Sequence, residues 1–543
     1  MRKVGNVTVP NTQAEPDGTA VADVRSMRHG FSLGGASALA FSVIRPLGSF
    51  TNVPLMIAAA GLAGWLAALL ILVVMLVVTA VFGALASRWP LEGSVAAWSR
   101  QLLGARVGLM TGWLYLCTYV LYMGLLAYFD AQRLLFLVGA SAPTWLQGAG
   151  AALVVIAVST IVNGLGRRVL SVLLVVCVAI SVIACAVYST LLLGHAQRGF
   201  FDLFQAPLGG SLDWNWLVGP FLIALAWATA NTMRGFELPA DVAEEIREPR
   251  VNVRRAMVWA LIVGGALVLY SMIALALAVP AASSVSTSMT QNPYAAAIGT
   301  VMQSALGEGS ARPFAALQII ATFVAIAVCQ LAASRTLWTM ARDREVPCHH
   351  WLVGLTSRNR MPMRALTLIG IATFVLILIA PDFTAFVLGG ASGLAFLLAF
   401  IVTLVGLLVA LRRGTWQTGS WSTGRWLGPV TVVGVVVLAA LAINLAWPRQ
   451  QLFGAGLQAW RPLIILAAIV IAGLILMAWA FRDGGVHVRN HGHVDRDLHE
   501  RILLAHTGTC SVCHRALAEG EEVFWNPEAH VTICVACDED VVA

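Results

Sequence analysis

The chain has 543 residues, of which 59% are hydrophobic and 11% are charged. Because an ordinary soluble domain carries roughly 25% charged residues, this composition excludes a soluble enzyme, a disordered chain and a disulfide-stapled secreted module. It indicates a polytopic membrane protein. The net charge of +7 does not indicate a nucleic-acid partner, because basic residues in a membrane protein mainly set its topology.

Twelve apolar runs are present, each near the roughly 20 residues that a helix needs to cross a bilayer. The predicted spans are 31–50, 64–86, 107–135, 147–165, 169–194, 216–237, 256–280, 313–337, 364–381, 383–411, 427–447 and 460–481. Arginines concentrate in alternate loops, which predicts a multi-pass plasma-membrane protein with both termini cytosolic and with Arg133 at an outer helix rim.

The predicted organisation has four parts along the chain. A cytosolic tail at 1–30 precedes a transmembrane domain at 31–481, and a histidine-rich cytosolic linker at 482–507 precedes a small module at 508–543.

Two of the predicted helices are interrupted. The first contains Pro46, which lacks an N–H group, and the permissive Gly48. In the sixth, apolar residues give way after Trp227 to the polar and small stretch 229–235 at mid-membrane depth. Broken helices expose backbone N–H and C=O groups, which bind substrates or ions where they line a cavity. The alternative is an ordinary proline kink in the first helix and a helix end in the sixth.

Four stretches resemble the amino acid–polyamine–organocation family of permeases. The first resembles the family's broken first helix, in Phe41-Ser42-Val43-Ile44 and Pro46-Leu47. The second resembles its loop between helices two and three, in Pro90, Gly93, Trp98, Gly104 and Gly112-Trp113. The third and most specific resembles its sixth helix and following loop, in Gly235-Phe236-Glu237, Ala243-Glu244-Glu245, Pro249, Asn252 and Arg255-Ala256. The fourth resembles the exit from its eighth helix, in Ser334-Arg335, Met340-Ala341-Arg342-Asp343 and Pro347.

This resemblance implies an all-α fold with ten core helices in two inverted five-helix repeats and two further helices appended. It implies secondary active transport, usually of amino acids or amines, and a midplane substrate site between helices one and six, with helices three and eight also contributing. The residues that we expect to bind substrate are Ser42, Ile44, Arg45, Gly48 and Ser49 in the first helix, and Trp227, Asn231, Arg234, Gly235 and Phe236 in the sixth.

Four ionisable residues lie within the predicted spans: Arg45, Asp130, Arg234 and Glu237. Charged groups in a membrane are costly to bury and usually have a function. One interpretation is that the two arginines pair with Asp130 and Glu237, as structural ion pairs or as part of a gate. The other is that at least one arginine faces the substrate cavity, where its planar fork suits a carboxylate. The sequence leaves both interpretations open.

The tail contains the pattern Cys510-x2-Cys513-x20-Cys534-x2-Cys537. Four thiolates in two close pairs suit tetrahedral zinc, with the spacing of a zinc ribbon. We therefore predict one zinc ion bound by these cysteines. The module has no basic stripe of the kind that reads nucleic acid, so it is interpreted as a regulatory or docking element for a cytosolic protein.

The chain shows no nucleophile elbow, phosphate-binding glycine loop or zinc-protease motif, and we predict that it is not an enzyme. The predicted function is secondary active transport of amino acids or related small organic solutes, with an anionic solute as one alternative. The alternative is a permease-like sensor that binds its ligand and signals through the zinc module.

Overall fold

The computed structural model describes residues 32–140, 144–207, 210–243, 246–279, 302–356, 361–379 and 385–482, and five short segments of the tail, at 500–503, 508–510, 515–518, 521–526 and 531–534. The chain divides into two compact units, Met1–Arg342 with Cys348–Ile475, and Asp343–Pro347 with Leu476–Ala543. The predicted N-terminal tail and most of the histidine-rich linker lie outside the described residues.

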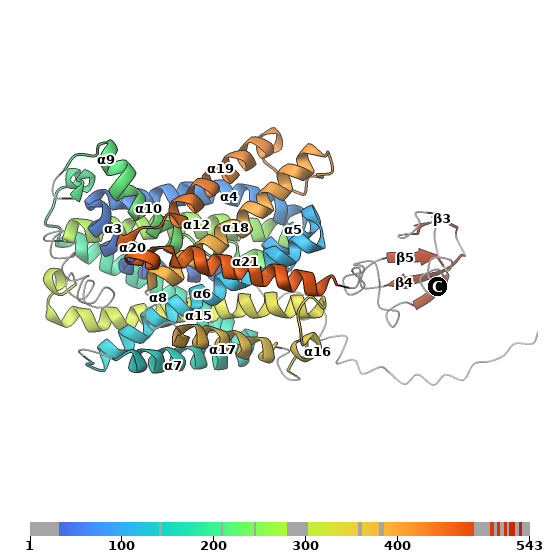
Figure 1. Cartoon of the computed structure of the whole chain (residues 1–543), viewed down its shortest axis with the longest axis horizontal. Helices are drawn as coiled ribbons and strands as arrows, with labels where there is room; N and C mark the ends of the chain where they lie inside the picture. Colours follow the sequence, from blue (N-terminus) through green and yellow to red (C-terminus); the bar gives the residue numbers. More distant parts are fainter. Residues whose placement is uncertain are drawn as a thin grey trace, which may run out of the picture. The chain divides into compact units, whose positions relative to one another are not determined.

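Helices make up almost all of the described membrane domain (Figure 1). The α-helices are α2 (Leu33–Ile44), α3 (Val53–Ala60), α4 (Trp65–Arg88), α5 (Ser94–Leu103), α6 (Ala105–Leu137), α7 (Trp145–Gly164), α8 (Arg167–Gly194), α9 (Trp214–Trp216), α10 (Leu222–Asn231), α11 (Leu238–Asp241), α12 (Pro249–Ala278), α15 (Ala311–Arg342), α16 (His349–Leu352), α17 (Met363–Ile379), α18 (Ala385–Arg412), α19 (Leu427–Ala446), α20 (Gln450–Phe453) and α21 (Arg461–Ala480). Short 3-10 helices are η1 (Pro46–Thr51), η2 (Leu62–Gly64), η3 (Phe200–Phe204), η7 (Glu308–Ser310), η8 (Gly424–Trp426) and η9 (Gly456–Trp460), and η5 (Leu217–Phe221) is a π-helix.

Each of the twelve predicted apolar runs overlaps at least one of these helices. Among the described residues, nine helices are long and apolar enough to cross a membrane, and the bent pair Leu33–Thr51 and Val53–Ala60 makes a tenth span. The predicted sixth span is divided among α9, η5 and α10, and the ninth is the shorter helix α17. The prediction of an all-α polytopic membrane protein is therefore confirmed.

Helix burial separates the centre of the domain from its periphery. In the most apolar 18-residue stretch of each helix, 89% is buried within the protein in α6 but only 11% in the span that contains α21. Helix α6 packs against α15, α18, α5 and α7, and Figure 1 shows α6 and α15 side by side. In a membrane protein the exposed apolar face of a helix contacts lipid, so α6 is a core helix and α19 and α21 are lipid-facing.

The first predicted break is present and has a local cause. Helix α2 ends at Ile44, and Arg45 takes a left-handed conformation, with φ 50° and ψ 68°. Pro46 then opens η1, a position where its missing N–H costs no helical hydrogen bond. The two parts of the span are bent by 55°, and helix continues to Ala60, beyond the predicted end at residue 50.

The second predicted break is also present. Helix α10 ends at Asn231, Thr232 is extended, and helix resumes only at Leu238 in the short α11. Between them, Met233 and Gly235 have φ values of 53° and 83°. Left-handed backbone cannot continue a right-handed helix, so the chain crosses this buried region without regular structure.

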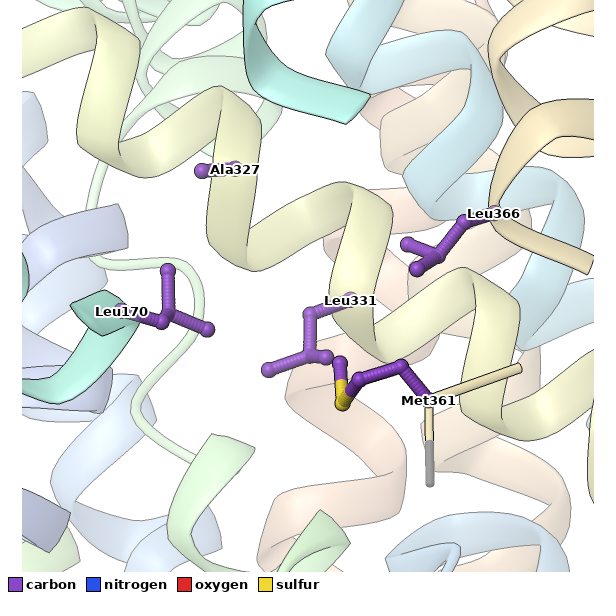
Figure 2. Close-up of a cluster of buried hydrophobic side chains, with 5 residues drawn as sticks. All are labelled: Leu170, Ala327, Leu331, Met361 and Leu366. Carbon is purple, nitrogen blue, oxygen red and sulfur yellow. The ribbon is translucent and has the colours of Figure 1, made fainter. Parts of the chain in front are cut away.

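A cluster of buried apolar side chains joins α8, α15 and α17. Figure 2 shows its members, Leu170, Ala327, Leu331, Met361 and Leu366. Each is at most 3% exposed. The cluster shows that these three helices are held together by close apolar packing.

The described part of the tail contains short antiparallel strands. Strands β1 (Glu500–Leu503), β4 (Glu522–Asn526) and β5 (Val531–Cys534) form a sheet in the order β1-β4-β5, and β2 (Gly508–Thr509) pairs with β3 (Ala516–Leu517). Cys510 directly follows β2 and is buried, and its N–H donates to the Arg515 carbonyl oxygen at 2.9 Å. Cys534 is the last residue of β5. The other two predicted zinc ligands, Cys513 and Cys537, lie outside the described residues.

Candidate functional site

The two helix breaks lie against each other. Helix α11 packs against α2, and a Cβ atom built on Gly235 would lie only 2.4 Å from the Cβ of Val43. The side-chain Nδ2 of Asn52 donates to the Asn231 carbonyl oxygen at 3.4 Å, although these residues are 179 positions apart. The fold therefore brings together the two interrupted segments that the sequence identifies as candidate binding elements.

The predicted site residues of the first break are buried, with different surroundings. The Ser49 hydroxyl lies 2.5 Å from the Ser271 hydroxyl of α12, and the Ser42 hydroxyl donates to the carbonyl oxygen of its own helix at Leu39. Ile44 packs against α12, since a Cβ on Gly264 would lie 2.9 Å from its Cγ2 atom. Ile44 is thus a helix-packing residue in this structure, and the two hydroxyls lie at the break itself.

The predicted site residues of the second break also divide into two kinds. Asn231 is 3% exposed, and its Oδ1 atom accepts no hydrogen bond within the described chain. Trp227 is buried one turn earlier on α10. The Phe236 ring instead packs between Phe82 and Phe400, with ring centroids 6.2 and 5.9 Å apart. Asn231 therefore retains an acceptor for a ligand, whereas Phe236 is part of an aromatic core.

Arg45 is a buried cation with few partners. Its side chain is 2% exposed, and its Nη1 donates to the Thr322 hydroxyl at a long 3.4 Å. Its Nε has no hydrogen-bond partner among the described residues, and no carboxylate there forms an ion pair with it. A guanidinium carries five N–H donors, and the buried Nε donor of Arg45 is unused among the described residues. A Cβ on Gly48 would lie 3.0 Å from the Arg45 Cζ, which shows that this glycine makes room for the guanidinium.

Asp130 forms its ion pair with a different arginine. The Arg133 Nη1 donates to Asp130 Oδ1 at 2.8 Å, and the side chains are 4% and 0% exposed. Arg133 also donates to Gln318 and Thr322 of α15 and to Thr51 of η1, at 3.2, 3.2 and 2.7 Å. Arg133 lies four residues before the end of α6, and this network buries its charge among the neighbouring helices.

Arg234 is held by aromatic rings and backbone carbonyl groups. Its Cζ lies 4.4 Å from the ring centroid of Tyr122 and 4.7 Å from that of Phe396. Its two terminal nitrogens donate to the carbonyl oxygens of Ala230 and Ser392 at 3.0 and 3.4 Å. Cation–π contacts and carbonyl oxygens both stabilise a buried guanidinium, so Arg234 is compensated by the protein without a carboxylate.

Glu237 is bonded to tyrosines of α6. The hydroxyls of Tyr119 and Tyr115 donate to Glu237 Oε1 at 2.5 and 3.3 Å. Tyr115 also lies 2.7 Å from Asp241 Oδ2, and Ser94 of α5 donates to the other oxygen of this carboxylate at 2.5 Å. The result is a buried polar cluster that joins α5, α6 and α11.

The ion pairs considered from the sequence, between Arg45 or Arg234 and either Asp130 or Glu237, are therefore absent among the described residues. Sequence reasoning missed Arg133 as the partner of Asp130, although a spacing of three residues on a helix places both side chains on one face. The bonds from Tyr115 and Tyr119 to Glu237 could not be inferred, because they join elements distant in sequence.

An apolar helix bundle with two adjoining broken helices is the architecture of a membrane transporter. The amino acid permease family model matches residues 31–475, and the chain belongs to this family. The family resemblance seen in the sequence is thereby confirmed, and the protein is a transporter of amino acids or related solutes and not an enzyme. None of the curated proteins compared with the chain matches it.

Proposed function

We propose that the protein is a secondary active transporter that binds its substrate where the two helix breaks meet and opens this site to each side of the membrane in turn. The contact between the breaks supports this proposal most directly, because interrupted helices free backbone groups at a buried position. Twelve membrane crossings, two inverted five-helix repeats and cytosolic termini in the plasma membrane are part of the proposal.

The proposed substrate carries an anionic group that binds Arg45. A cation near the bilayer centre costs at least about 2.5–3.5 kcal/mol, so a compensating anion is expected. The cluster of Arg45, Arg133 and Asp130 contains two positive charges and one negative charge. A substrate carboxylate would neutralise the remaining positive charge and use the open Nε donor of Arg45.

Arg45 is the better candidate of the two predicted arginines. Arg234 already has two aromatic rings and two carbonyl oxygens around its guanidinium. Arg45 has one long hydrogen bond. We therefore assign substrate binding to Arg45, Ser49 and Asn231, and a structural role to Arg234.

Uptake into proteoliposomes tests this proposal. Radiolabelled acidic, neutral and cationic amino acids are offered to the wild type, to Arg45→Gln and to Arg234→Gln. We expect uptake of acidic substrates by the wild type, its selective loss in Arg45→Gln with normal thermal stability, and reduced stability but unchanged charge preference in Arg234→Gln. Uptake of neutral or cationic amino acids alone would contradict the anionic substrate, and ligand binding without net flux would contradict transport.

For the tail we propose a zinc-binding module that docks a cytosolic protein. Two observations support the metal site: Cys510 is buried beside the β2–β3 hairpin, and Cys534 ends a strand of the neighbouring sheet. Cysteines at the ends of short strands can bind a metal that stabilises so small a unit. Metal analysis of the full-length protein, with an expected value of one zinc per chain, tests this part of the proposal.

A further inference from the structure

A groove of about 790 Å³ lies at the surface of the membrane domain, apart from the helix breaks. One wall is formed by η5 and the start of α10, and the other by α19 and the chain that leads into α20. The volume falls within the range of roughly 300–1,000 Å³ typical of sites for small molecules. The groove is therefore large enough to hold a substantial part of an amphiphilic molecule.

The walls of the groove face the surroundings of the bundle and not its core. Val218 and Ile443 on the two walls are 46% and 65% exposed. Only 28% of the most apolar 18-residue stretch of the span that contains α19 is buried within the protein. Exposed apolar side chains on a peripheral membrane helix contact lipid chains, so a molecule can enter this groove from the bilayer.

One end of the groove is polar and charged. Trp447, at the end of α19, is 62% exposed, and tryptophan at a helix end marks the interface between hydrocarbon and headgroups. Arg449 and Gln450 follow in the lining. The Arg449 guanidinium donates to the backbone oxygen of Asn444 and, at 2.6 Å, to its side-chain Oδ1. These two bonds hold a positive charge in place at the headgroup level.

We propose that this groove is a binding site for a membrane phospholipid with a net negative headgroup. The lipid phosphate would bind Arg449, and an acyl chain would lie between η5 and α19. Charge complementarity favours this occupant, because the described residues of the lining include an arginine and no carboxylate. A free amino acid is too short to extend from Arg449 along both apolar walls, whereas an acyl chain is long enough to do so.

Two glycines provide a matched pair of variants to test the site. A Cβ built on Gly219 in the groove wall meets no atom within 4 Å, and the same holds for Gly150 on α7. The Cβ of Gly219→Phe therefore enters open space at the groove wall, where the added ring competes with a bound acyl chain, whereas Gly150→Phe makes the same change elsewhere on the membrane domain. Arg449→Gln removes the charge, and Arg449→Lys retains it.

The assay is native mass spectrometry of the full-length protein with added phosphatidylglycerol or phosphatidylcholine, supported by thermal unfolding. We expect the wild type and Gly150→Phe to prefer phosphatidylglycerol, and Gly219→Phe to lose the bound lipid. Arg449→Gln should weaken phosphatidylglycerol binding by roughly tenfold, the loss expected for one charge-assisted contact, and Arg449→Lys should recover most of it. Equal binding of both lipids by the wild type, or unchanged binding by Gly219→Phe, would overturn the proposal.

Discussion

Gly235→Ala tests whether the two helix breaks depend on close backbone contact. The substitution has two separate costs. A left-handed backbone such as that of Gly235, with φ 83°, costs a residue that has a Cβ roughly 1–2 kcal/mol. The new Cβ would lie 2.4 Å from Val43 Cβ and 2.6 Å from its Cγ1, and such overpacking typically costs about 1–3 kcal/mol. The expected loss in free energy of unfolding is therefore about 2–5 kcal/mol.

A second glycine separates these two costs. Gly139 has a nearly equal φ of 84°, but a Cβ there meets no atom within 4 Å. Gly139→Ala should therefore cost only the backbone part, roughly 1–2 kcal/mol. Val43→Gly removes the atoms that the new Cβ of Gly235→Ala would strike, so the double variant should be less destabilised than the sum of the single variants by about 1–3 kcal/mol.

The measurements are detergent-induced unfolding of the purified protein and uptake into proteoliposomes. Gly235→Ala should reduce uptake even where the folded protein is recovered, because it pushes the two breaks apart. If Gly235→Ala is no more destabilising than Gly139→Ala, or if the effects of Val43→Gly and Gly235→Ala simply add, the proposed contact does not hold the breaks together.

Three further predictions concern the buried charges and the tail. Asp130→Asn leaves Arg133 buried without its ion pair and should lower the free energy of unfolding by about 3–5 kcal/mol; unchanged stability in detergent-induced unfolding would show that the pair is dispensable. Gly48→Ala places a methyl group 3.0 Å from the Arg45 Cζ and should raise KM for an acidic substrate more than KM for a neutral one. Equal effects on both substrates in uptake assays would contradict this. Cys510→Ser should reduce zinc below one per full-length chain in metal analysis and leave uptake intact, and full zinc occupancy would remove this cysteine from the ligand set.

The helices were predictable because their signal is local. A run of about 20 apolar residues is a membrane helix wherever it occurs, since every backbone polar group must be bonded within the segment. The first break could be placed near Pro46 for a similar reason, because proline lacks the N–H that a continuing helix needs. The second break could be placed near Gly235, because polar and small residues interrupt the apolar run there, but the left-handed backbone of this glycine came from the structure.

The partners of the buried charges were not predictable in this way. Composition and span placement identify Arg45 and Asp130 as ionisable residues within the membrane, but not which atoms surround them. In the folded chain, Asp130 bonds to Arg133 on its own helix, and Arg133 in turn reaches η1 and α15.

The sequence alone determined that this protein lies in a membrane, which family it resembles and where two of its helices break, because these properties depend on residues close together along the chain. Only the tertiary structure decided that the breaks touch, that Arg234 lies against Tyr122 and Phe396, and that the Nε donor of Arg45 has no partner among the described residues. The physical reason is that a buried charge takes the nearest compensating dipole or charge in space. That neighbour is set by how helices distant in sequence pack together.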